Sequence, residues 1–180
     1  MKTLSVFSIC LLTSLSLFGQ NPNEQDEDYV LERLPEWFIK DNPLDGLVLN
    51  EDYIFDNRLN PLYLEADFNG DSYLDVAFPI KNRKTEASGF AIFHGNSKDV
   101  FIIGAGIKIT NGLSDDHHYI DIWKVNYENI NEPGLDERTG TGEKGELILV
   151  NPSIKIEKSE VGGGIIYWNG NEYAYFHQTC

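Results

Sequence analysis

The sequence predicts one compact, mainly β domain of antiparallel strands, with a short helix near its start. Three observations support this prediction. Short apolar or alternating segments recur between turns rich in Gly, Asn and Asp, as expected for antiparallel strands. The stretch at 167–173, Tyr-Trp-Asn-Gly-Asn-Glu-Tyr, places Asn-Gly between aromatic segments, which is a strong hairpin signal. A single aspartate-rich loop at 67–75 separates two further strand-like segments.

Residues 1–20 have the layout of an export signal. Lys2 provides a basic start, an apolar run continues to Phe18, and the chain then becomes polar and acidic. An uncleaved anchor is the alternative, although the run is short and serine-rich for a membrane span. We expect residues 21–28 to be a flexible leader and residues 29–180 to form the single domain. The expected location is the periplasm or the extracellular side of a bacterial envelope.

Composition limits the expected partners. The 180 residues carry a formal net charge of −15, which repels nucleic acid and anionic membrane surfaces and favours cations or basic partners. Cys10 lies in the predicted signal and Cys180 is left without a partner, so no disulfide within the domain is expected. After removal of the signal, no other segment is apolar enough to predict an integral membrane span.

The helical and extended segments follow in order. Residues 29–40 mix apolar and charged positions at near-helical spacing, and Pro35 limits any helix there to two short turns. Trp37 and Phe38 are expected to pack on the core. Strands are expected where the pattern is apolar or alternating, at 62–66, 76–80, 89–94, 100–103, 119–125, 146–150, 165–168 and 172–176. The strand at 146–150 is expected to be buried.

Two segments lack such a pattern. Residues 128–145 are rich in Gly, Asn, Glu and Thr, which predicts a long mobile loop. The three consecutive glycines at 162–164 are expected to be a second flexible point.

The loop from Asp67 to Asp75 is the one motif with metal chemistry. Side-chain oxygens stand at relative positions 1, 3, 5 and 9, on Asp67, Asn69, Asp71 and Asp75, and position 7 is Tyr73, which offers its backbone carbonyl. Calcium takes about six to eight oxygen ligands, and close carboxylates repel one another without a cation. The spacing therefore predicts a calcium site. A solvated turn of ordinary turn-forming residues is the alternative.

This loop resembles the calcium loop of integrin-α-type repeats, also called FG-GAP or VCBS repeats, which have the form Asp-x-Asn-Gly-Asp-x-x-x-Asp between two strands. The resemblance covers roughly residues 62–103, and Ser72 stands where the repeat usually has glycine. A helix–loop–helix calcium hand is excluded, because Phe78 occupies the position of its bidentate Glu. A closed propeller of about four to eight blades is too long for this chain. The resemblance thus implies one blade-like unit within an antiparallel β domain.

The chain is also similar to small exported proteins of Bacteroidetes-type bacteria. These proteins combine one early Asp/Asn-rich loop with a final Tyr-Trp-Asn-Gly-x-x-Tyr hairpin, which here is 167–173. The likeness implies a fold and little about function.

Two weaker constellations remain. Asp116 and His118 form a candidate second metal site, which needs His94 or Glu143 as a further ligand; solvated surface is the alternative. Aromatic side chains offer a candidate sugar-stacking or partner surface, with core packing as the alternative, at Trp123, Trp168, Tyr173 and Tyr175.

Taken together, the patterns favour an exported, calcium-stabilised, non-catalytic binding module whose partner is a protein or a glycan. One alternative is an acidic inhibitor or immunity-type protein for a basic partner. The other is a metal-dependent hydrolase that uses the region 115–118. No serine lies in a nucleophile elbow, so the sequence singles out no catalytic residue.

Overall fold

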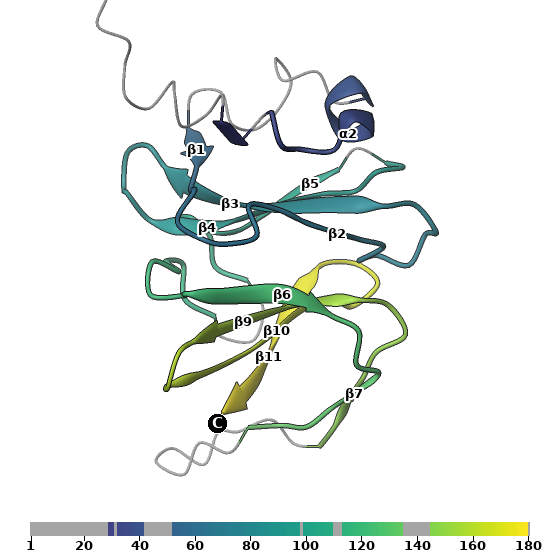
Figure 1. The fold of residues 1–180 in the computed structure, drawn as a ribbon. Coiled ribbons are helices and arrows are strands. Elements are labelled where there is room, and N and C mark those ends of the chain that lie inside the picture. The colour runs from purple at the N-terminus through teal and green to yellow at the C-terminus, as the bar shows by residue number, and fades with distance from the viewer. Residues whose placement is uncertain are drawn as a thin grey trace, which may run out of the picture.

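Two antiparallel β-sheets lie face to face, and a short helix covers the outer face of one of them (Figure 1). Neither sheet closes into a barrel. The mainly β, antiparallel architecture and the short N-terminal helix predicted from the sequence are confirmed. The computed structural model describes residues 29–30, 32–41, 52–97, 99–109, 113–134 and 145–179.

The first sheet has the strand order β1-β3-β4-β5, and β2 pairs with the part of β3 that β1 leaves free. Strands β2 to β5 form a four-stranded antiparallel meander, which is the arrangement of a propeller blade. The strands are β1 (Tyr53–Phe55), β2 (Leu64–Ala66), β3 (Asp75–Asn82), β4 (Ser88–Phe93) and β5 (Val100–Gly104).

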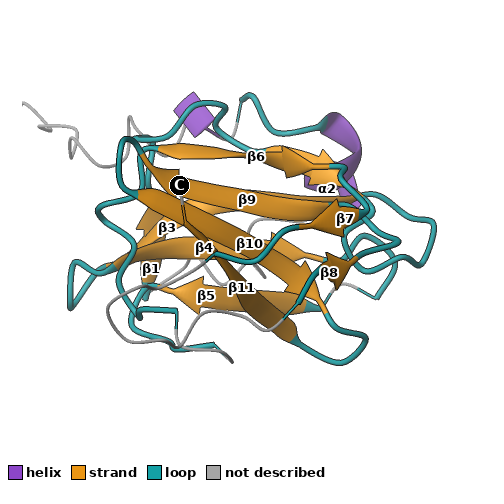
Figure 2. Ribbon diagram, turned by 90° about the horizontal axis from the view of Figure 1, so that it is seen from below, coloured by secondary structure: helices purple, strands orange, loops and turns teal. Residues whose placement is uncertain are grey.

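The second sheet has the order β11-β10-β9-β6, and a separate two-stranded pair, β7 with β8, lies beside it (Figure 2). The predicted Asn-Gly hairpin joins β10 to β11, where Trp168 pairs with Tyr173 and Gly170 has a φ of 101°. The strands are β6 (Ile122–Asn126), β7 (Ile130–Asn131), β8 (Leu147–Ile148), β9 (Ser153–Lys158), β10 (Gly162–Trp168) and β11 (Tyr173–Thr179).

Helix α2 (Glu36–Asp41) begins directly after Pro35, whose carbonyl accepts a hydrogen bond from the N–H of Ile39. Proline suits this place because its missing N–H is not needed at a helix start. Phe38 is fully buried, with its ring edge-on to Phe93 at 5.2 Å. The predicted break at Pro35 and the packing of this helix on the core are therefore confirmed.

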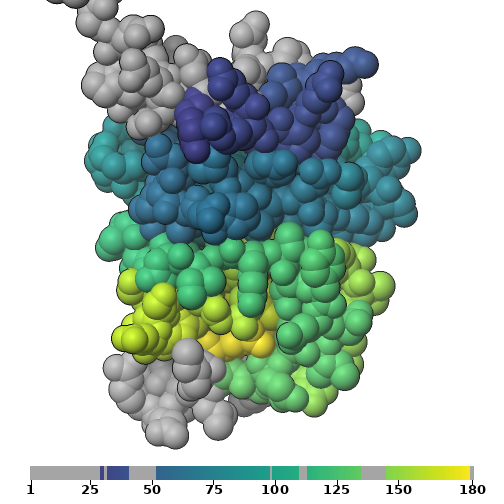
Figure 3. Space-filling model, viewed as in Figure 1, coloured from purple at the N-terminus to yellow at the C-terminus, as the bar shows by residue number. Residues whose placement is uncertain are grey.

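Strands β3 and β4 are buried on both faces, since successive side chains alternate between two clusters. Phe78 and Phe93 face the helix, whereas Phe90 and Ile92 face the second sheet, where they meet Trp123. Figure 3 shows these layers, with the helical segment above the first sheet and the second sheet below. Apolar contacts thus join every layer to its neighbour.

The prediction of a buried strand at 146–150 is wrong. Strand β8 has only two residues, and Ile148 and Val150 are 70% and 90% exposed. The side chains that alternate with them, Leu147 and Leu149, pack against the second sheet. The segment therefore lies on the outer face of the second sheet rather than inside the sandwich.

The three consecutive glycines form the start of β10 and are not a flexible point. A Cβ atom at Gly164 would lie 2.3 Å from the carbonyl oxygen of Phe176 and 2.6 Å from the Tyr175 ring. Glycine is therefore required because β11 and the tyrosine ring approach the backbone closely.

Several predictions lie outside the described residues. They are the signal and leader at 1–28, Cys180, and the middle of the 128–145 segment; its first part is described and includes β7. Within the described part of the chain, no helix has the length and apolar character needed to cross a membrane.

Candidate functional site

The aspartate loop connects β2 to β3 and folds around its own carboxylates. The side chain of Asp67 accepts hydrogen bonds from three successive N–H groups, those of Gly70 at 2.7 Å, Asp71 at 3.0 Å and Ser72 at 2.9 Å. The Asp71 carboxylate in turn accepts from the N–H of Tyr73 at 2.9 Å. Gly70 and Ser72 both have left-handed backbone angles, with φ of 78° and 73°. This tight course gathers Asp67 and Asp71 in one turn.

Asp75 closes the loop from inside the protein. It is fully buried, and its carboxylate accepts hydrogen bonds from the N–H groups of Phe68 at 2.8 Å, Asn69 at 3.2 Å and Gly95 at 3.0 Å. Burial raises the pKa of Asp75 to about 6, although these hydrogen bonds act to lower it. Asp75 therefore ties the start of the loop to the turn after β4.

The loop fits a calcium ion less fully than its sequence predicts. Among the described residues, no three His, Cys, Asp or Glu side chains are grouped so that they would hold a metal ion. Asp75 is directed to backbone N–H groups, whereas Asn69 and Asp71 contact each other at 3.2 Å on the more exposed side. Each carboxylate oxygen has two lone pairs, so Asp67 and Asp71 retain capacity to accept. Fewer charged ligands correspond to weaker calcium binding.

The loop carboxylates also act on two buried side chains next to them. Nε2 of His94 lies 2.8 Å from the Tyr173 hydroxyl. Burial, together with the charges of Asp75, Asp67 and Asp71, raises the pKa of Tyr173. Burial lowers the pKa of His94, against the opposing effect of nearby carboxylates that include Asp71 and Asp67. Negative potential is therefore concentrated at this end of the sandwich, and a cation would relieve it.

Three of the four candidate surface aromatics belong to the core. Trp123, Tyr173 and Tyr175 are 2%, 4% and 7% exposed, and the Trp123 indole donates to the Pro61 carbonyl at 2.7 Å. They lie on the inner face of the second sheet, so they pack in the core and do not form a binding surface. Trp168 is the one that is partly exposed, at the end of β10.

A groove that no sequence pattern indicated adjoins the aspartate loop. It has a volume of about 400 Å³ and opens between three segments: the loop, residues 147–152 and the β10–β11 turn. The Asn151 side chain lies against Gly70, where an added Cβ would be 2.3 Å from Nδ2. None of the described residues that line it is charged: they are Phe68, Asn69, Leu147, Ile148, Leu149, Val150, Asn151, Pro152, Tyr167, Trp168, Asn169 and Gly170.

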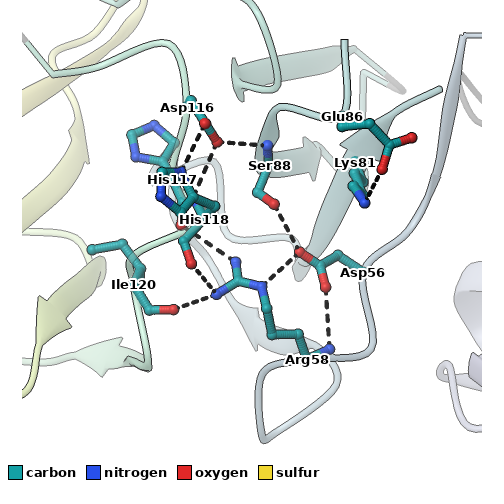
Figure 4. A network of polar contacts seen from close by, with 9 residues as sticks. All are labelled: Asp56, Arg58, Lys81, Glu86, Ser88, Asp116, His117, His118 and Ile120. Atoms are coloured by element: carbon teal, nitrogen blue, oxygen red, sulfur yellow. Dashed lines mark hydrogen bonds and ion pairs between the residues drawn. The ribbon is translucent and has the colours of Figure 1, made fainter. Parts of the chain in front are cut away.

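The candidate second metal site is a structural contact. His118 Nδ1 lies 2.7 Å from Asp116 Oδ2, while Asp116 Oδ1 accepts from the N–H of Ser88 at 2.9 Å (Figure 4). Ser88 is the first residue of β4, and His94 directly follows its last residue. About 20 Å of extended chain separates the two, so His94 and His118 cannot bind the same metal ion. Glu143 lies outside the described residues. The structure therefore brings Asp116 and His118 together without His94.

Arg58 fixes the same segment from below. Its guanidinium donates to the carbonyls of His118 at 3.0 Å and Ile120 at 2.5 Å, and it pairs with Asp56 at 2.9 Å (Figure 4). His117, which directly precedes His118, is fully buried, and both of its ring nitrogens lack a hydrogen-bond partner among the described residues. The residues 116–118 thus hold the connection between the two sheets.

Comparison with protein-family models, with curated proteins and with solved structures finds no match for this chain. The resemblance to integrin-α-type repeats accordingly stays a prediction from the loop sequence.

Proposed function

We propose that the chain is an exported, calcium-binding β domain that acts as a non-catalytic binding module. The observation that carries this proposal is that the aspartate loop is also a wall of the neutral groove. Phe68 and Asn69 line the groove, and their N–H groups are held by Asp75. A calcium ion at Asp67, Asn69, Asp71 and the Tyr73 carbonyl would stiffen that wall.

The two alternatives have less support. An acidic inhibitor of a basic partner rests on the net charge of −15, and the groove offers such a partner no counter-charge. A hydrolase that combines His94 with Asp116 and His118 requires them in one cleft, yet they adjoin opposite ends of β4. The groove beside the loop is therefore the better candidate for a working surface.

Calcium binding of this kind is expected to be weak. Affinity depends on the number of charged ligands, and extracellular calcium modules commonly have Kd values of roughly 0.1–1 mM. A ligand that binds only the folded state at tenfold its Kd stabilises that state by about 1.4 kcal/mol. The proposal therefore predicts a modest stabilisation that saturates in the millimolar range.

Calorimetric titration with calcium chloride, paired with urea denaturation in calcium or in chelator, tests the proposal. We expect binding heat and stabilisation for the natural chain, and neither for Asp71→Ala. The matched control is Asp52→Asn, which changes an exposed carboxylate next to the opposite end of β3 and should leave both signals intact. Absence of heat up to ~10 mM calcium, or a signal retained in Asp71→Ala, would contradict calcium binding at this loop.

A further inference from the structure

We propose that the groove beside the aspartate loop binds a neutral oligosaccharide. This inference rests on the proposed role as a binding module, but it does not require calcium to occupy the loop. Three features of the groove carry it: the absence of charge, the free amide groups and the aromatic side chains.

The absence of charge excludes ionic ligands. Charged residues make up 24% of the chain, so about three would be expected among the twelve described lining residues, whereas none of these is charged. An anionic ligand would find no Lys, Arg or His among the described lining residues and would approach a protein of net charge −15. A cationic ligand would find no carboxylate among these described residues. The ligand that fits is therefore uncharged.

The polar groups of the groove are amides that retain hydrogen-bonding capacity. The side chain of Asn151 makes no hydrogen bond within the described part of the chain, and it is held in place by its packing on Gly70. Asn169 uses Oδ1 to accept from the N–H groups of Asn171 and Glu172, which leaves its Nδ2 available. An amide both donates and accepts, as sugar hydroxyls do. The polar side of the groove thus matches a polyhydroxylated ligand.

The apolar part of the groove contains Trp168 and Tyr167. Trp168 is fixed by edge-on contacts with His94 at 5.0 Å and with Phe101 and Tyr173, each at 5.1 Å. Its indole N–H has no acceptor among the described residues. Sugar rings present apolar C–H faces that pack on aromatic rings, and a ring already held by its neighbours loses little entropy on binding. The volume of about 400 Å³ is within the ~300–1,000 Å³ of small-ligand sites.

Affinity electrophoresis tests this proposal. The protein produced from the full chain is run in native gels that contain hydroxyethylcellulose, xyloglucan, galactomannan, dextran, laminarin or starch, and in a gel that contains anionic polygalacturonate. We expect retardation by at least one neutral polysaccharide and none by polygalacturonate, because a groove without cationic groups cannot offset the repulsion. Each gel is run with calcium and with chelator.

Two variants assign any retardation to the groove. Asn169→Asp keeps the Oδ1 atom that accepts from the turn but removes the Nδ2 donor and adds a negative charge, so it should abolish retardation. The matched control is Asn171→Asp, which adds the same charge in the same turn at a residue that does not line the groove and should bind normally. Asn151→Ala should weaken binding roughly tenfold through the lost hydrogen bonds. Urea denaturation checks that each variant is folded.

Retardation by no neutral polysaccharide, retardation by polygalacturonate alone, or equal retardation of Asn169→Asp and Asn171→Asp would overturn the proposal. The calcium titration separates this failure from failure of the proposed function. Calcium binding heat without retardation would contradict oligosaccharide binding and support the calcium site. Retardation without calcium binding heat would contradict the calcium site and support oligosaccharide binding.

Discussion

The two ends of β4 lie next to two buried ionisable side chains that have opposite surroundings. At one end, Asp75 is satisfied by three backbone N–H groups. At the other end, His117 packs on Phe90 at 5.6 Å between ring centroids, and neither ring nitrogen has a hydrogen-bond partner in the part of the chain that the structure describes. Both residues are fully buried, so the difference lies in the hydrogen bonds and not in the exposure.

Burial shifts the pKa of each group toward its neutral form, but different interactions oppose the shift in the two places. Burial raises the pKa of Asp75 to about 6, while its N–H partners oppose that shift. Burial lowers the pKa of His117 to about 4; the charges of Asp116 and Asp115 oppose the shift, and Arg58 adds to it. A satisfied buried group holds structure together, whereas an unsatisfied one weakens it once it must become charged.

The largest effect should come from removing the satisfied group. Asp75→Ala leaves three buried or partly buried N–H groups without an acceptor, and each costs about 1–3 kcal/mol. We expect the free energy of unfolding to fall by about 4 kcal/mol, measured by urea denaturation in chelator so that calcium plays no part.

The matched control for this change is Asp71→Ala, in the same loop. Its carboxylate is partly exposed and accepts from one backbone N–H, so water replaces most of what is lost and the expected cost is about 1 kcal/mol. Equal losses of stability in the two variants would show that the hydrogen bonds of Asp75 do not hold the loop against the turn after β4.

The loop could be located from the sequence because its signal is local. The spacing of Asp67, Asn69, Asp71 and Asp75 gave a strand–loop–strand unit, and Asn169-Gly170 gave the final hairpin in the same way. The inward course of Asp75 could not be predicted, because its partner Gly95 belongs to a different turn. The position of Asp75 in the sequence does not show whether its carboxylate binds a metal ion or accepts hydrogen bonds from the backbone.

Features that depend on distant contacts were missed. Strand β9 was not predicted, although Ile154 and Ile156 alternate with Lys155 and Glu157 as in a half-buried strand; its place between β6 and β10 depends on pairing with distant segments. The groove forms where Gly70 meets Asn151, which no local pattern reveals. Nor does the sequence distinguish the buried His117 from the exposed His118 beside it.

The second effect concerns His117 and depends on pH. Its folded-state pKa of about 4 lies below the ordinary value of 6.5, so the unfolded chain binds more protons between these values. The stability from burying the neutral ring is therefore complete above pH 6.5 and is lost as the pH falls toward 4. At pH 5 the loss should be about 2 kcal/mol. Urea denaturation at pH 7.5 and pH 5 measures it.

The measured quantity is the pH-dependent change in the free energy of unfolding, compared between the natural chain and His117→Met. Methionine fills a similar volume without a titratable group. This difference cancels the contribution of Asp75, which titrates in the same range with the opposite sign because its pKa is raised. The matched control is His177→Met, a partly exposed histidine on β11 that should retain the full pH dependence. If His117→Met loses as much stability at pH 5 as the natural chain, His117 is not the source.

The smallest effect should come from Asp116→Ala, the counterpart of Asp75→Ala at the other end of β4. Asp116 also accepts from two backbone N–H groups, those of Ser88 at 2.9 Å and His118 at 3.1 Å, yet it is partly exposed. Water therefore replaces the lost acceptor, and we expect a cost of about 1 kcal/mol by urea denaturation at pH 7.5. Removing this charge also removes an interaction that favours protonated His117, so the pH-dependent loss should still begin near pH 6.5 but should continue to lower pH and cost more in total. A loss as large as that of Asp75→Ala would show that the number of N–H partners, and not their burial, decides what a carboxylate contributes.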